Sequence, residues 1–307
     1  MDVDPDPALA ALETEQVNPA SSGLDRFSAA EIAALMNAED ARVVAAVREV
    51  LPAIGRAIDA IADHLQGGGR LVYVGAGSSG RLGVLDASEC PPTFNTPPEM
   101  VVGIIAGGDV ALRRAVEEIE DRPEAGREDM ERLCVSGRDV VVGIATSGRT
   151  PYVLGAIRAA SERGAMTIGL TCNRGTPLEG LVDLMIAPSV GPEVIAGSTR
   201  LKAGTATKMV LNMLSTGAMV RLGKTYGNLM VDLRATNSKL RDRSLRILQT
   251  VTGLEAHEAA THLKAADGEV KAAIVTALTG LSPEEARERL KEHGGRIRPL
   301  LEREPGS

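Results

Sequence analysis

The stretch LVYVGAGSSGR, residues 71–81, decides the fold. It opens with four apolar or aromatic residues and then passes through Gly75, Gly77 and Gly80 into a helical pattern. A short apolar run without polar alternation is typical of a parallel strand that is buried on both faces. A glycine-rich turn from such a strand into a helix presents helix N–H groups, which bind anions such as phosphate. The sequence therefore predicts an α/β protein with an anion site at this turn.

Four further apolar runs of the same kind follow, and helical patterns separate them. The predicted strands are Leu71–Val74, Val101–Ala106, Val140–Ala145, Met166–Thr171 and Leu184–Ala187, and the predicted helices between them cover about 82–90, 110–121, 123–134 and 151–163. A long Ala-rich helix is predicted from about 198 to 222. This alternation predicts a doubly wound, mostly parallel sheet that is flanked by helices.

Helical patterns lie on both sides of this α/β region. We predict an N-terminal arm and helix over 1–58, an α/β domain over 59–224 and a small all-helical domain over 225–307. In the last of these, TGLEAHEAATHLKAADG (252–268) is echoed by TGLSPEEARERLKEHGG (279–295) at an offset of 27 residues. Two similar helical units favour a packing or dimer element over a chemical one.

Composition excludes several classes of protein. The 307 residues carry 34 basic and 41 acidic side chains, and no basic run of the kind that nucleic-acid binding needs is present. Three tyrosines, two phenylalanines and no tryptophan leave few rings for stacking on bases or sugars. No apolar stretch reaches the ~18 residues of a membrane span, and the first ten residues are acidic where a signal peptide would be basic. We therefore expect a soluble, cytoplasmic protein that contacts neither nucleic acid nor membrane.

Cysteines and histidines give no sign of a metal site. Cys90, Cys134 and Cys172 form neither an even disulfide framework nor a CxxC pattern. The four histidines also lack the spacing of metal ligands. The sequence therefore predicts no metal.

Two hydroxyl-rich loops follow predicted strands, at 75–81 and 146–151. Hydroxyls beside the N–H groups of a helix N-terminus suit a phosphomonoester. A dinucleotide is disfavoured, because the acidic residue expected about 20 residues after the first loop is missing. A well-capped helix would explain one such loop, but two in one sheet favour a phosphate site. The candidate ligands are Ser78, Ser79, Thr146, Ser147 and Thr150.

Two glutamates lie where a structural role is not obvious. Glu89 falls on the apolar side of its predicted helix, which Pro91 is expected to stop immediately afterwards. A carboxylate at the negative end of a helix is disfavoured as the ion, which suits a general acid. Glu120 continues an apolar row in the helix predicted over 110–121. The pattern alone leaves open that Glu89 is a solvated helix end and Glu120 a boundary residue.

Four motifs carry a resemblance to a known family. They are GAGSSGRLGVLDASECPPTF (75–94), TSGRTP (146–151), GSTRLKAGTATKMVLNMLSTG (197–217) and GNLMVDLRATNSKL (227–240). Through them the chain resembles the N-acetylmuramic acid 6-phosphate etherases, which are built on a sugar isomerase (SIS) domain. The resemblance implies a cytoplasmic enzyme of cell-wall amino-sugar recycling. Its reaction would cleave the ether between sugar C3 and D-lactate with water, without a metal or redox cofactor.

The resemblance also implies roles for individual residues. Glu89 matches the acid of the family, and Glu120 matches its second active-site glutamate. The implied mechanism is elimination of lactate followed by addition of water, with Glu89 protonating lactate and Glu120 removing the C2 proton. By analogy with sugar-phosphate SIS enzymes, the expected phosphate ligands are Ser79, Ser147 and Thr150, with Ser78 and Thr146 nearby.

Several charged residues near the long predicted helix have two interpretations. Arg200, Lys202 and Lys208 could steer an anionic substrate or could simply lie on the helix surface, and Glu193 just before them is a further candidate. Two other functions also stay open at this point. One is a sugar-phosphate isomerase, and the other is a non-catalytic regulatory protein that binds a sugar phosphate, as the related mammalian glucokinase regulator does.

The expected assembly is a homodimer. A sheet of few strands with an exposed Ala-rich long helix and a small helical appendage should bury surface against a second copy.

Overall fold

The structure is a computed structural model that describes residues 9, 11–114, 116, 118–233 and 238–301. The chain falls into two compact units, one made of Met1–Ser88 and Glu99–Ser215 and the other of Glu89–Pro98 and Thr216–Ser307. The domain limits predicted from the sequence, at 58/59 and 224/225, stay predictions.

Five parallel strands form the sheet of the first unit, in the order β2-β1-β3-β4-β5. They are β1 (Leu71–Gly75), β2 (Val101–Ile105), β3 (Val140–Ile144), β4 (Met166–Leu170) and β5 (Leu184–Ile186). The predicted strands agree with these bounds to within about one residue at each end. Every residue of β1 and β3 is buried, as expected for strands covered on both faces.

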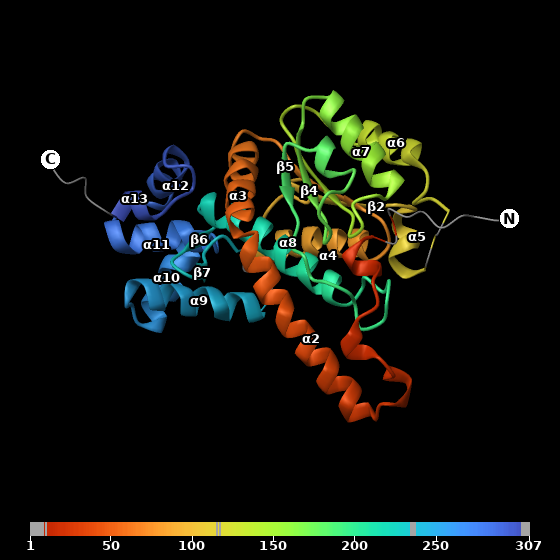
Figure 1. The fold of residues 1–307 in the computed structure, drawn as a ribbon. Helices are drawn as coiled ribbons and strands as arrows, with labels where there is room; N and C mark the ends of the chain where they lie inside the picture. Colours follow the sequence, from red (N-terminus) through yellow and green to blue (C-terminus); the bar gives the residue numbers. More distant parts are fainter. Residues whose placement is uncertain (1–8, 10, 115, 117, 234–237, 302–307) are drawn as a thin grey trace. The chain divides into compact units, whose positions relative to one another are not determined.

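Helices cover both faces of this sheet (Figure 1). In chain order the helices of the first unit are η1 (Glu13–Glu15), η2 (Pro19–Ser21), η3 (Leu24–Arg26), α2 (Ala29–Glu49), α3 (Leu51–Gln66), α4 (Gly77–Phe94), α5 (Gly108–Arg113), α6 (Pro123–Arg132), α7 (Pro151–Glu162), η4 (Glu179–Leu181) and α8 (Lys202–Arg221). The last turns of α4 and α8 belong to the second unit. Val72 and Val74 of β1 pack in one cluster with residues of α6 and α7. Tyr73 points the other way, and its hydroxyl donates to Asp86 of α4 at 2.9 Å. Because successive strand residues face opposite sides, this confirms the doubly wound arrangement.

Helix α4 does not stop where the prolines predicted. It runs on through Pro91 and Pro92 to Phe94. Cys90 and Phe94 are 2% and 6% exposed, so the last turn is held by packing, which outweighs the two helix N–H groups that the prolines lack. Glu89 is therefore not at a helix C-terminus, and the prediction that placed it there is wrong.

The helix predicted over 110–121 is also too long. α5 ends at Arg113, and the backbone at Arg114 is extended. Pro123 starts α6, and the residue before a proline disfavours helical geometry, as the extended Arg122 shows. Glu120 consequently lies in the turn before α6 and not on a helix face.

The regular structure described in the second unit is helical apart from one hairpin. It contains β6 (Thr225–Tyr226), β7 (Leu229–Met230), α9 (Ser238–Thr252), α10 (Ala256–Ala265), α11 (Val270–Thr279), α12 (Pro283–Glu292) and α13 (Arg298–Leu301). The repeated sequence is a structural repeat, because capping boxes start α10 at Glu255 and α12 at Ser282, again 27 residues apart. In the described part of the chain, no helix is long and apolar enough to cross a membrane.

Candidate functional site

The two hydroxyl loops follow the adjacent strands β1 and β3. β1 pairs with β2 on one side and with β3 on the other, so the winding of the chain reverses between β1 and β3. Ligands of open α/β sheets bind in the crevice at such a switch point, outside the carboxyl ends of the strands. The hydroxyl loops 75–81 and 146–151 lie at this position.

The first loop brings helix α4 very close to the end of β1. A Cβ at Gly80 would lie 2.6 Å from the Gly75 carbonyl oxygen, so the contact admits no side chain. Ser78 and Ser79 occupy the first turn of α4, where N–H groups lack helical acceptors, and both are partly exposed. Two hydroxyls and the free helix N–H groups can thus meet one anion.

The second loop leads from β3 into α7. The Gly148 N–H donates to the Ala145 carbonyl at 2.8 Å, and the Arg149 N–H donates to the Ser147 hydroxyl at 3.3 Å. Among the described residues, the side chain of Thr150 caps no N–H of α7, although Thr150 is the residue before the helix. A capping role therefore does not account for this hydroxyl. Thr146, Ser147 and Thr150 are all partly exposed.

Gly148→Ala is expected to disrupt this second loop. Gly148 has φ +65°, and a methyl group there would lie 2.2 Å from Oγ1 of the buried Thr176. The left-handed conformation alone costs alanine ~1–2 kcal/mol. The clash adds to this cost, and we expect phosphate binding to weaken at least about tenfold.

Gly175→Ala is the matched control, because Gly175 also has φ +65° but nothing within 4 Å of its would-be Cβ. Thermal unfolding and calorimetric titration with phosphate compare the two variants. Equal effects would contradict a specific role of the Gly148 contact.

Glu120 is attached to the start of the same helix. Its carbonyl oxygen accepts a hydrogen bond from the Tyr152 N–H at 3.0 Å, two residues after Thr150. The side chain is partly buried. The structure therefore brings Glu120 to the N-terminus of α7, beside the second hydroxyl loop.

Glu89 has different surroundings from those predicted. It is exposed, whereas Asp86, Ala87 and Cys90 around it in α4 are buried. The expected position on the apolar side of the helix is therefore wrong. By its contacts Glu89 belongs to the second unit, whereas Glu120 and the hydroxyl loops belong to the first.

Asp86 is a buried acid that the sequence reasoning missed. It accepts hydrogen bonds from the Tyr73 hydroxyl at 2.9 Å and from the Ser215 hydroxyl at 3.2 Å. Burial raises the pKa of Asp86, and these hydrogen bonds oppose the rise. The signal was available, since Asp86 stands alone in the apolar run LGVLDA. It links α4 to β1 and α8.

Glu193 has a structural partner in the first turn of α8. Its carboxylate accepts from the N–H groups of Lys202 at 3.0 Å and Ala203 at 2.9 Å, and the side chain is fully buried. Burial raises the pKa of Glu193, and the two N–H donors oppose the rise. The contacts of Glu193 are those of a helix cap.

Lys202 cannot steer a substrate. It is 1% exposed, and its Nζ lies 2.6 Å from a carboxylate oxygen of Glu39. Arg200 is exposed, and Lys208 donates to Asn212 on its own helix. Of these three cations, the exposed Arg200 and the partly exposed Lys208 have the solvent exposure that attraction of an anionic substrate requires.

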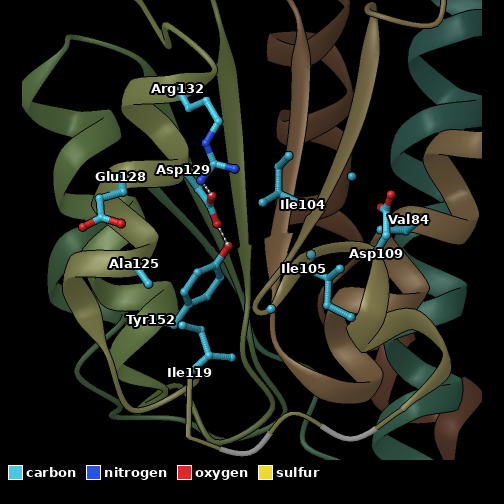
Figure 2. Close-up of a pocket in the computed structure, with 13 residues that line it drawn as sticks. Val84, Ile104, Ile105, Asp109, Ile119, Ala125, Glu128, Asp129, Arg132 and Tyr152 are labelled. Atoms are coloured by element: carbon cyan, nitrogen blue, oxygen red, sulfur yellow. Dashed lines mark hydrogen bonds and ion pairs between the residues drawn. The ribbon is translucent and has the colours of Figure 1, made fainter.

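A cavity of about 490 Å³ lies beside the edge strand β2 (Figure 2). Figure 2 shows Asp129 between Tyr152 and Arg132 on one wall, with Ile104 and Ile105 of β2 opposite. The charged lining residues are Asp109, Glu128, Asp129 and Arg132. Three carboxylates against one guanidinium do not suit a phosphate dianion, so the hydroxyl loops remain the candidate phosphate site. Among the described residues, no group of three or more His, Cys, Asp or Glu could hold a metal ion.

Two family models match the chain. The model described as the N-terminal SIS domain of glucokinase regulatory protein matches residues 53–161, and the SIS domain model matches residues 110–217. A phosphoheptose isomerase from Francisella tularensis is similar in structure, with a TM-score of 0.49 and 21% identity over 64% of this chain and 98% of that one.

Much greater similarity is found in sequence. A protein of Rhodopirellula baltica is 56% identical over 293 residues, which cover 95% of this chain and 97% of its own. A Rubrobacter xylanophilus protein is 56% identical over 89% of this chain and 91% of its own. An Edwardsiella ictaluri protein is 53% identical over 96% and 98%. All three are named N-acetylmuramic acid 6-phosphate etherase.

Proposed function

The chain belongs to the family of N-acetylmuramic acid 6-phosphate etherases, and on this premise we propose that Glu89 and Glu120 divide the proton transfers of the reaction. The enzyme cleaves the D-lactyl ether of N-acetylmuramic acid 6-phosphate with water. The products are N-acetylglucosamine 6-phosphate and D-lactate, in the recycling of cell-wall amino sugars.

The chemistry is an elimination followed by an addition. In the ring-opened sugar, the aldehyde at C1 acidifies the C2 proton, and Glu120 removes it. The C3–O bond then breaks, and Glu89 gives a proton to the departing lactate oxygen. Water adds to C3 of the unsaturated aldehyde and a proton returns to C2, so one water is consumed for each ether bond broken. Loss of either general acid–base group typically costs ~10²–10⁴-fold in rate.

The observation that carries this proposal is the attachment of Glu120 to the start of α7. The hydrogen bond from the Tyr152 N–H to the Glu120 carbonyl holds the backbone of this partly buried residue at the start of α7, which supports a role beside the loop with Thr146, Ser147 and Thr150. If the loop binds the phosphate ester of the sugar, the carbon chain of the sugar extends from the loop toward neighbouring side chains such as Glu120. One end of the substrate would thus be fixed while the base acts on another carbon.

Ser147→Ala tests the phosphate site. A hydrogen bond to a charged group is worth about 1.5–3 kcal/mol, so we expect phosphate and substrate to bind about ten times more weakly or worse. Calorimetric titration with inorganic phosphate measures the loss. Ser161→Ala is the matched control, since Ser161 is exposed near the other end of the same helix. A co-crystal with the ester away from Ser79, Ser147 and Thr150 would refute the site.

The proposed assembly is a cytoplasmic homodimer. The long helix α8, one of the features on which the expectation rested, has half of its residues buried within the chain and so offers less surface than expected. Helix α2 supports the proposal instead, because only three of its 21 residues are buried. Ile32, Leu35 and Met36 are partly exposed and share one side of α2 by their i, i+3 and i+4 spacing. Among the described residues no two cysteines form a disulfide, in keeping with a reducing compartment.

Sedimentation velocity at micromolar concentration should give twice the mass of the chain. Leu35→Glu should shift the protein toward the monomer, because a charge in a buried apolar contact is strongly disfavoured. Glu49→Lys, an exposed change near the end of the same helix, serves as the control. A fully active monomer would contradict the proposal.

A further inference from the structure

We propose that Thr14 and Asn173 are positioning residues. Through them the N-terminal segment Glu13–Asn18 fixes the orientation of the second hydroxyl loop, 146–151. The proposal rests on the phosphate site described above. It concerns residues that lie before the α/β region in the chain and on the loop after β4. Neither residue carries a group that takes part in the ether chemistry.

The carbonyl oxygen of Thr146 is the point at which the loop is held. It accepts hydrogen bonds from the Thr171 hydroxyl at 2.7 Å, the Asn173 side-chain amide at 2.9 Å and the Cys172 N–H at 3.0 Å. Thr171, Cys172 and Asn173 are each at most 1% exposed. All three donors come from the residues that follow β4, so the carbonyl is fixed toward that side.

Fixing this carbonyl also fixes the next N–H. The peptide bond is planar and trans, so the N–H of Ser147 points opposite to the C=O of Thr146. No described residue accepts a hydrogen bond from that N–H. It is therefore directed away from the β4 loop and left available to an anion at the hydroxyl loops.

Thr14 determines which way the Asn173 amide faces. Asn173 Nδ2 donates to the Thr14 hydroxyl at 3.0 Å as well as to Thr146, and the Thr14 N–H donates to Asn173 Oδ1 at 3.4 Å. Both amide protons and the amide oxygen are thus used. With the amide reversed, Oδ1 would face the Thr146 carbonyl oxygen, two acceptors with no proton between them. The Thr14 N–H, which can only donate, selects the orientation that holds the loop, and the Thr14 hydroxyl anchors the amide nitrogen in that orientation.

The segment that carries Thr14 is itself firmly attached. The Thr14 carbonyl accepts from the Gly197 N–H at 3.3 Å, and the Ser189 hydroxyl bonds the carboxylate of Glu13. Asn18 donates to the Pro192 carbonyl at 3.2 Å and to Glu39 at 2.8 Å. The segment therefore provides a fixed support on the loops after β4 and β5.

The test uses Thr14→Val, which keeps the shape of the side chain and removes its hydroxyl. Calorimetric titration with inorganic phosphate should show binding about three- to tenfold weaker, the range of one neutral hydrogen bond. With the muramyl phosphate, KM should rise by a similar factor while kcat changes less. Thr14→Ser should restore both values. Thr205→Val is the matched control, because the exposed Thr205 hydroxyl donates to the Leu201 carbonyl one turn earlier in the chain, away from Asn173.

A double-mutant comparison separates this link from general stability. Adding Thr14→Val to Asn173→Ala should weaken phosphate binding no further, since both act on the same contact. Phosphate binding at the wild-type level in Thr14→Val, with or without a lower melting temperature, overturns the proposal. If Ser147→Ala also binds phosphate normally, the phosphate site itself is wrong and the link falls with it.

Discussion

Glu89→Gln is expected to stop lactate release while the C2 hydrogen continues to exchange with solvent. Glutamine cannot give a proton to the departing lactate oxygen, and an alkoxide leaves slowly without one. We expect lactate release to fall by about 10²–10⁴-fold. Exchange at C2 should persist, because Glu120 is unchanged. The fold should be unaffected, since Glu89 is exposed.

The measurement is proton NMR in deuterated water combined with an enzymatic assay of D-lactate. Glu99→Gln is the matched control, because Glu99 is an exposed carboxyl that follows the same helix. Lactate release near the wild-type rate in Glu89→Gln would show that Glu89 is only an exposed helix residue. The acid would then have to be another group.

Glu120→Gln is expected to abolish both C2 exchange and lactate release, again by about 10²–10⁴-fold. Without the base the C2 proton stays in place, and the C3–O bond has no adjacent carbanion to expel lactate. The link to Tyr152 uses the backbone carbonyl of Glu120 and survives the substitution. Phosphate binding should therefore be retained.

Glu118→Gln is the control for this second variant, because Glu118 is exposed in the same turn. Continued C2 exchange in Glu120→Gln would rule it out as the base. If the two variants exchange their behaviours, the chemistry stands and the roles of the two glutamates are reversed.

The five strands could be predicted closely because each is a short apolar run that ends at glycine or at a hydroxyl-rich turn. Two helix ends could not. The last turn of α4, which runs across Pro91, depends on the burial of Cys90 and Phe94. This burial is a tertiary effect. Helix α5 ends at Arg113 although the apolar pattern continues, and Val116 in that pattern is 37% exposed, so no buried packing extends the helix there.

The candidate site was predictable in part for a related reason. Ser and Thr residues directly after a strand indicate a helix N-terminus whatever the strand order of the sheet. The two loops could therefore be identified from the sequence. The burial of Lys202 against Glu39 could not, because the two residues are 163 positions apart. The same is true of Asn173 and Thr14, 159 apart. Polar residues in such long-range contacts look like surface residues in a sequence.

The most direct measurement is to incubate the wild-type protein with N-acetylmuramic acid 6-phosphate in deuterated water enriched in ¹⁸O. Elimination and addition break the C3–O bond, so D-lactate should appear with unlabelled ether oxygen. The N-acetylglucosamine 6-phosphate should carry ¹⁸O at C3 and deuterium at C2. Binding without lactate release would indicate a regulatory protein. A rearranged sugar that keeps its lactyl group would indicate an isomerase. Label in the lactate hydroxyl would place the cleavage at the wrong bond, and any of these results would contradict the two-glutamate elimination.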